Sequence, residues 1–314
     1  MKNAGIVSLL FLLPMSLLAG NKGVPSFGVK IYGHGRPMIL IPGLRGDGEG
    51  TYSGVVDHFR DLYTCYVITL AGFAGQRPSG RTSDVLMGQR DELLQYIKDQ
   101  QMDHPVLVGF SFGGQLALWM ASTEPDLFGP VIDLDGAPFD DGMEDPAINE
   151  DSLHKQVDSF IHIYQTASAQ EIARRDSLRH IPAAERSAFQ YLKNLITDTL
   201  YIPGVIEWDI ESDMREASLL SFEGERLDLR EDVARIKSPI LVLGSWKGFD
   251  KPKLLWEAEM IMKQQFRKAK YVHIVYSKEG RHFFMWDDYD WMVDQMDQFL
   301  NVISRKMING EPIK

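Results

Sequence analysis

The residues best suited to chemistry are a serine enclosed by glycines, in the run Gly109-Phe110-Ser111-Phe112-Gly113. Residues 106–108 before it are apolar, as in a strand buried on both faces, and the segment after it favours a helix. A sharp turn between strand and helix needs glycines, because a Cβ there would collide with the neighbouring element. The pattern predicts that Ser111 is a nucleophile whose hydroxyl stands at the carboxyl edge of a sheet.

A serine hydroxyl is a weak nucleophile at neutral pH, so it needs an imidazole to accept its proton and a carboxylate to orient that imidazole. Of the eight histidines, His282 lies just beyond the last predicted strand, in a glycine-led loop that can turn the ring toward Ser111. We therefore predict that His282 is the base. Surface or core roles explain the histidines in other loops, helices and strands, which are His34, His58, His104, His154, His162, His180 and His273.

Two aspartates could be the acid that orients His282. Asp135 ends the strand that follows the serine, and Asp250 lies in the loop after the strand at residues 240–244. Either carboxylate could reach the imidazole. The loop at residues 245–249 is better suited to packing than to presenting a carboxylate, so we favour Asp135 and keep Asp250 as the alternative acid.

The elements that must position these residues alternate between strands and helices. Such alternation predicts an α/β fold with right-handed crossovers, in which helices flank a mostly parallel central sheet. A final amphipathic helix carries Met292, Met296, Phe299, Leu300 and Ile303 on one face. The predicted strands span residues 27–32, 38–41, 64–70, 106–110, 131–134, 240–244 and 271–276.

The strand pattern is interrupted between two core segments, residues 24–139 and 237–314. Residues 140–236, which we call the helical insertion, contain no convincing buried strand but several helical stretches, at 152–166, 168–178, 182–197 and 211–220. An insertion between two strands of one sheet lies where strand ends carry ligand sites. We expect it to form a lid over the site.

Composition excludes several classes of function. The chain has 314 residues and a net charge of −11, which argues against nucleic acid as a partner because a basic surface is lacking. No H-E-x-x-H motif or cysteine cluster suggests a metal site, and no cofactor is predicted. Cys65, the only cysteine, is most simply a buried hydrophobic residue. The expected partner is a small-molecule acyl substrate.

The N-terminus has the pattern of an export signal. Lys2 gives a positive start, residues 6–18 are almost wholly apolar, and the small residues Ala19 and Gly20 follow. Residues 1–20 are therefore predicted to be a signal peptide that directs the chain to the periplasm or outside the cell, without stable membrane insertion after cleavage. The alternative is an uncleaved anchor in the inner membrane.

The run Leu134-Asp135-Gly136-Ala137-Pro138-Phe139 resembles an exported bacterial subgroup of hydrolases, and three landmarks make the chain resemble an α/β-hydrolase with a serine nucleophile. They are Pro42-Gly43-Leu44 after one strand, the turn at Ser111, and Gly280-Arg281-His282-Phe283-Phe284 after the last strand. The resemblance implies the α/β-hydrolase fold with a Ser, acid, His order along the chain. It also implies two backbone N–H donors for an oxyanion, those of Leu44 and Phe112.

Serine at the turn predicts acyl-enzyme chemistry, whereas aspartate there would predict an alkyl-enzyme ester. The leading hypothesis is a serine hydrolase that cleaves a carboxylic ester or related acyl bond with a Ser-His-Asp triad. A cofactor-free haloperoxidase or an acyltransferase using the same triad is the alternative within enzymes. A binding protein that kept the fold without the activity is the third possibility.

Overall fold

The sheet decides how the rest of the chain is arranged. The computed structural model describes residues 24–144, 147–247 and 254–309. Seven strands of this described part form one sheet in the order β1-β3-β2-β4-β5-β6-β7, in which only β1 runs antiparallel to its neighbour. This confirms the predicted α/β class. The strands are β1 (Gly28–Gly33), β2 (Arg36–Ile41), β3 (Tyr63–Thr69), β4 (Val106–Phe110), β5 (Val131–Leu134), β6 (Ile240–Gly244) and β7 (Val272–Tyr276).

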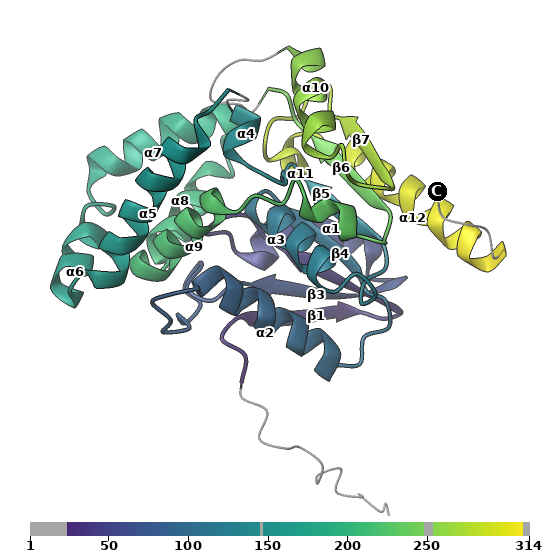
Figure 1. The fold of residues 1–314 in the computed structure, drawn as a ribbon, viewed down its shortest axis with the longest axis horizontal. Coiled ribbons are helices and arrows are strands. Elements are labelled where there is room, and N and C mark those ends of the chain that lie inside the picture. Colours follow the sequence, from purple (N-terminus) through teal and green to yellow (C-terminus); the bar gives the residue numbers. More distant parts are fainter. Residues whose placement is uncertain (1–23, 145–146, 248–253, 310–314) are drawn as a thin grey trace, which may run out of the picture.

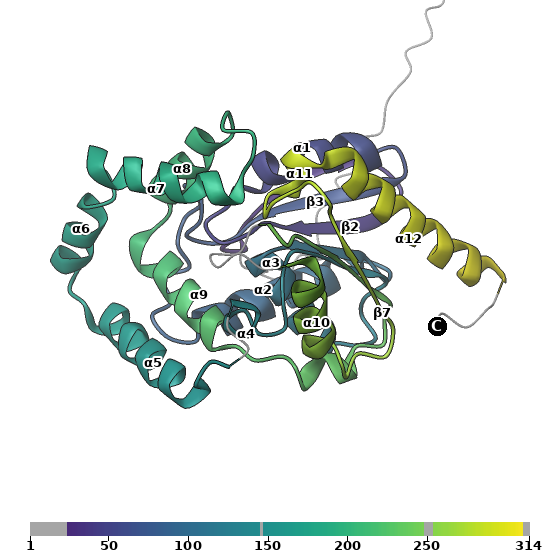
Figure 2. The same ribbon diagram turned by 90° about the horizontal axis from the view of Figure 1, so that it is seen from above.

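Helices cover both faces of the sheet, as Figure 2 shows. The helices α1 (Gly48–Phe59), α11 (Phe284–Asp287) and α12 (Tyr289–Asn309) pack on one face. The opposite face is covered by α2 (Val85–Asp99), α3 (Phe112–Thr123) and α10 (Leu255–Gln265). Strands β4 and β6 are buried at every position, which is why their sequences are uninterrupted apolar runs.

The last helix uses its predicted apolar face. Met292 and Met296 are fully buried in α12, and Leu300 and Ile303 are nearly so, while Phe299 packs beside them. The spacing of these residues places them on one side of a helix, and that side lies against the sheet. The opposite side of α12 carries polar residues and faces solvent.

Between β5 and β6 the described chain is helical. Figures 1 and 2 both place the longer helices of this region together, to one side of the sheet. Its elements are α4 (Asp141–Glu144), α5 (Glu150–Thr166), α6 (Ala169–Ser177), α7 (Pro182–Leu195), α8 (Ile202–Glu211), α9 (Met214–Arg226) and the 3-10 helix η1 (Asp232–Arg235).

One helix of this region corrects the sequence prediction. The sequence predicted a helix at 211–220, but α8 already ends at Glu211 and α9 begins at Met214. The break forms because the Asp213 side chain accepts a hydrogen bond from the Glu216 N–H (2.8 Å) and caps α9. Helix α8 was not predicted. Its first turn contains Pro203, which is tolerated there because its missing N–H would have no helical partner.

The predicted signal peptide, residues 1–20, lies outside the described residues. Within residues 24–144, 147–247 and 254–309, none of the helices combines the length and the apolar character needed to cross a membrane.

Candidate active site

Ser111 occupies a strained turn between β4 and α3. Its φ of 53° and ψ of −120° are unusual for a residue with a side chain and cost about 1–3 kcal/mol. Close backbone packing holds the turn, because a Cβ on Gly109 would lie 2.1 Å from the Gly113 carbonyl oxygen, and one on Gly113 would lie 2.3 Å from that of Ile41. The Ser111 N–H also donates to the Leu134 carbonyl (2.8 Å). The hydroxyl is thus presented beyond the end of β4.

His282 reaches Ser111 from the loop after β7. Its Nε2 lies 3.0 Å from the Ser111 Oγ. The loop is fixed by Ser277, whose Oγ accepts from the Gly280 N–H (2.7 Å) and donates to Asp288 (2.6 Å). The ring lies between Phe110 and Phe283, with centroid distances of 4.8 Å and 5.4 Å. Packing and loop hydrogen bonds therefore aim the imidazole at the serine.

The structure brings Asp135 to the other nitrogen of the imidazole. The Asp135 Oδ2 lies 2.6 Å from the His282 Nδ1. The carboxylate also accepts two hydrogen bonds from Ser245, from the N–H (2.5 Å) and from the hydroxyl (2.7 Å). Asp250, the alternative acid, lies outside the described residues. Ser111, His282 and Asp135 therefore form one continuous chain of hydrogen bonds.

The turn after β2 lies directly against the serine. A Cβ on Gly43 would be 3.4 Å from the Ser111 Cβ and 2.9 Å from the Phe110 ring. This close approach places the turn that carries Leu44 against Ser111, and both residues line the same cavity. Phe112 begins helix α3, so its N–H has no partner within the helix. The two N–H groups expected to stabilise an oxyanion thus belong to segments that flank Ser111.

These residues open into a cavity of about 680 Å³. The helical insertion provides an apolar wall, from α7 and α8, and Phe283 continues this wall beside His282. A polar wall carries Arg45 and Asp209. The other histidines of the described residues do not line the cavity. The apolar lining from the helical insertion includes Ala188, Leu192, Leu195, Val205 and Ile206.

A stack of aromatic rings joins the helical insertion to the core beside His282. Trp286 lies between Tyr201 and Phe283, stacked on each, with centroid distances of 4.5 Å and 5.0 Å. The ring centroid of Trp208, in α8, lies 6.1 Å from that of Trp286. The stacking of these rings fixes the wall of the cavity next to the imidazole.

Residues 38–295 match the alpha/beta hydrolase family, a span that contains Ser111, Asp135 and His282. The chain belongs to the α/β-hydrolase family. No curated protein matches this α/β-hydrolase closely enough to suggest a substrate.

Solved structures share the fold of this α/β-hydrolase at low sequence identity. An enol-lactonase from Burkholderia xenovorans has a TM-score of 0.64 and 12% identity, over 88% of this chain and 96% of that one. An esterase from Exiguobacterium antarcticum has a TM-score of 0.66 and 12% identity, over 88% and 95%. A protein described as a non-heme bromoperoxidase from Mycobacterium tuberculosis has a TM-score of 0.65 and 14% identity, over 91% and 99%. At these identities the likeness shows the fold alone.

Two polar residues of this α/β-hydrolase escaped sequence reasoning. Ser245, the first residue after β6, is buried and orients Asp135 as described above. Asp133, inside β5, is fully buried, and its Oδ1 accepts from the Gly136 N–H (2.8 Å), which fixes the turn that carries Asp135. Burial raises the pKa of Asp133 to about 8. A carboxylate within an apolar strand was the available signal, because such a group needs a specific partner.

Metal ligation finds no support in the described part of the chain. No group of three or more His, Cys, Asp or Glu side chains lies close enough together there to hold an ion. The acidic run that contains Asp287 and Asp288 instead makes hydrogen bonds to backbone N–H groups and hydroxyls, such as those of Thr197 and Ser277.

Proposed function

We propose that the protein is a serine hydrolase that cleaves a carboxylic ester or related acyl bond through an acyl-enzyme intermediate. The observation that carries the proposal is the hydrogen-bond chain from the Ser111 Oγ through His282 to Asp135, with steps of 3.0 Å and 2.6 Å. Such a chain converts a weakly nucleophilic hydroxyl into a reactive one.

Asp135 selects the tautomer of His282. A carboxylate at Nδ1 accepts a hydrogen bond from the Nδ1–H, which leaves the lone pair of Nε2 facing the Ser111 hydroxyl. His282 then removes the hydroxyl proton as Oγ attacks the acyl carbon, and Asp135 stabilises the imidazolium that results. His282 returns the proton to the leaving group, and a water molecule activated by the same imidazole releases the acyl group.

The negative charge that develops on the acyl oxygen needs donors that are already in place. We assign this role to the backbone N–H groups of Leu44 and Phe112, because both flank Ser111. Fixed backbone donors require no reorganisation during the reaction, so each contributes substantially to the rate.

We assign the acyl group of the substrate to the apolar wall of the cavity and the helical insertion to the role of lid. The insertion supplies Leu192, Leu195 and Val205 to this wall, which suits a hydrocarbon chain or ring. The esterase and the enol-lactonase of the same fold act, by their names, on ester bonds, which is consistent with this chemistry.

The proposal is tested by assaying purified protein against p-nitrophenyl esters of graded acyl length, together with a fluorophosphonate probe. We expect turnover and covalent labelling at Ser111, located by mass spectrometry of peptides. Labelling without ester turnover, combined with acyl transfer to an added alcohol or with halogenation, would favour the acyltransferase or haloperoxidase alternative. A folded protein that shows neither labelling nor turnover would be a binding protein.

A further inference from the structure

The turn that carries Leu44 has an unusual conformation. Leu44 and Arg45 are its central residues, and the Gly46 N–H closes it by donating to the Gly43 carbonyl oxygen (3.0 Å). Arg45 has a φ of 58°, in the left-handed region. Glycine adopts this region easily, whereas a residue with a Cβ is strained there. The conformation of the turn therefore needs support from contacts of the Arg45 side chain.

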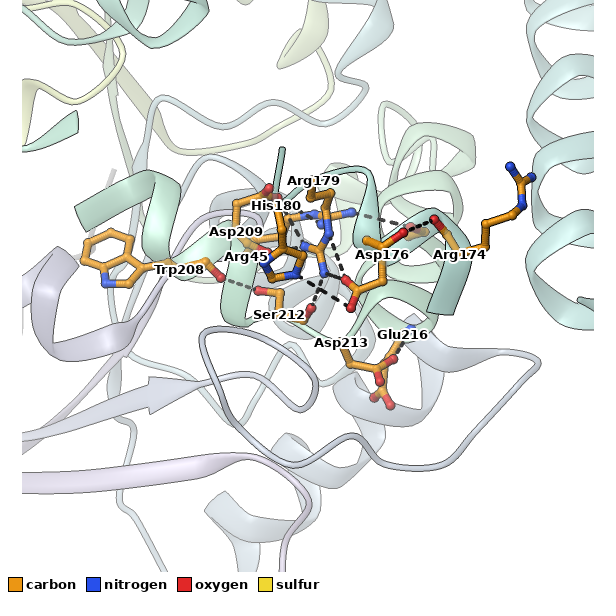
Figure 3. A network of polar contacts seen from close by, with 12 residues as sticks. Arg45, Arg174, Asp176, Arg179, His180, Trp208, Asp209, Ser212, Asp213 and Glu216 are labelled. Carbon is orange, nitrogen blue, oxygen red and sulfur yellow. Dashed lines mark hydrogen bonds and ion pairs between the residues drawn. The ribbon is translucent and has the colours of Figure 1, made fainter. Parts of the chain in front are cut away.

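Those contacts come entirely from the helical insertion. The Arg45 Nη1 donates to the Asp209 Oδ1 of α8 at 2.9 Å, and its Nη2 donates to the Ser218 hydroxyl of α9 at 3.4 Å. The Arg45 side chain is only 18% exposed. Figure 3 shows its guanidinium beside Asp209, at the centre of a network of polar contacts.

The partner of Arg45 is itself held in place. Arg179 lies within 3.8 Å of the same Asp209 carboxylate and donates to the backbone oxygens of Asp209 and Ser212 at the end of α8. Trp208, the residue before Asp209, packs on Gly50 of α1 so closely that a Cβ on this glycine would lie 2.1 Å from the indole. The contact between α8 and the segment that follows the turn is therefore tight.

Electrostatics agree with a fixed guanidinium. Burial lowers the pKa of Arg45, and the Asp209 carboxylate partly offsets this effect. Arginine remains charged, so loss of Asp209 would leave a buried cation without its ionic partner. The Arg45 guanidinium would then be more stable when hydrated. If it moved toward solvent, the turn would lose the contacts that support it.

We propose that Arg45 is a positioning residue that, by holding Asp209, keeps the turn 43–46 in the conformation that aims the Leu44 N–H at the oxyanion. The helical insertion thereby supports the reaction through a contact made away from the reacting atoms. This inference rests on the proposed function, because the direction of the Leu44 N–H affects the rate only if an oxyanion forms beside Ser111.

The test compares Arg45→Ala with Arg45→Gly, using p-nitrophenyl butyrate hydrolysis and the rate of fluorophosphonate labelling. Alanine removes the contacts with Asp209 and Ser218 but keeps the backbone strain at residue 45. We therefore expect kcat to fall at least ~10-fold, since removal of a whole oxyanion donor costs roughly 10²–10³-fold. Glycine also removes these contacts but adopts a φ of 58° without strain, so kcat should stay within about threefold of wild type. KM should change little in both variants, and labelling rates should follow kcat.

Asp209→Asn tests the partner without altering the turn, and Asp158→Asn is its matched control. Both carboxylates belong to the helical insertion, pair with an arginine and are about half exposed, but Asp158 pairs with Arg226, whereas Asp209 pairs with Arg45 of the turn. Asp209→Asn should lower kcat severalfold, and Asp158→Asn should leave it unchanged. Melting temperatures show whether each variant is folded, so Asp209→Asn decides the matter if Arg45→Ala does not fold.

Three results would overturn the proposal. Equal kcat losses in Arg45→Ala and Arg45→Gly would show that the side chain, and not the turn, matters. A rise in KM restricted to esters that carry a carboxylate would make Arg45 a substrate-binding residue. Wild-type kcat in Arg45→Ala would show that the turn keeps its conformation without the contacts of the Arg45 side chain. In all three cases wild-type hydrolysis persists, whereas failure of the proposed function appears as wild-type protein without turnover or labelling.

Discussion

Replacing Asp135 by Asn should trap His282 in the unproductive tautomer. The backbone N–H of Ser245 points at the Asp135 Oδ1 (2.5 Å) and cannot turn away. The oxygen of the new amide must therefore take the Oδ1 position, which places its NH₂ group at the Oδ2 position, facing the His282 Nδ1. An amide donor there forces Nδ1 to accept, so Nε2 carries the proton and cannot accept one from Ser111.

The expected loss follows from this geometry. The Asn NH₂ group would be satisfied by the His282 Nδ1 and by the Ser245 hydroxyl, which can rotate to accept, so the fold should be retained. The general base would be lost. In the serine protease case given as a worked example of this change, kcat falls about 10⁴-fold, which corresponds to about 5 kcal/mol of activation free energy. We expect a loss of that order here.

The assay is kcat for p-nitrophenyl ester hydrolysis, with the melting temperature as the control for folding. Asp250→Asn is the companion variant and should keep activity within about threefold of wild type, because we assign the acid to Asp135. The reasoning would be refuted if Asp135→Asn kept more than a tenth of wild-type kcat. If Asp250→Asn lost activity and Asp135→Asn kept it, Asp250 would be the carboxylate that orients His282.

Three further predictions test separate parts of the account. Ser111→Ala should lower kcat ~10³-fold or more at an unchanged melting temperature, and turnover above a tenth of wild type would contradict the nucleophile assignment. Because the pKa of Asp133 is raised from 3.8 to about 8, the folded chain holds one more proton than the unfolded chain between these values, and stability is lost as the pH rises through this window. In urea unfolding, the free energy of unfolding of wild type should fall by on the order of 4 kcal/mol relative to that of Asp133→Asn between pH 5 and pH 8. If both proteins showed the same dependence on pH, the raised pKa of Asp133 would be contradicted. N-terminal sequencing of periplasmic protein should find a start near residues 20–22, whereas Met1 recovered from the membrane fraction would indicate an anchor.

The central strands of the sheet were predictable from sequence because they are buried on both faces. Uninterrupted apolar runs such as those of β4 and β6 have few alternatives in a chain of this composition. Helix boundaries were less predictable. Helix α1 begins at Gly48, although glycines disfavour a helix, because the Asp47 side chain accepts a hydrogen bond from the Gly50 N–H (2.6 Å) and caps the first turn.

The residues of the candidate site also differ in how well the sequence predicted them. Ser111 and His282 were found because each follows a recognisable strand, and the structure places them within hydrogen-bonding distance. The choice between Asp135 and Asp250 depended on the path of the loop after β6, which local patterns do not determine. Ser245 and Arg45 were missed because their contacts join segments far apart in sequence, and neither residue type signals such a role. The catalytic roles of all these residues stay predictions until they are measured.

The order of the strands also determines when the site can form during synthesis. Ser111 and Asp135 precede the helical insertion, whereas Ser245 and His282 follow it. Strand β6 must pair with β5 across this long intervening segment, and β7 can join the sheet only beside β6. Such distant pairings form late, because loop closure is unfavourable until the contacts are made. A nascent chain therefore carries Ser111 before His282 is beside it, and the hydrogen-bond chain through His282 can be completed only when the last strand has joined the sheet.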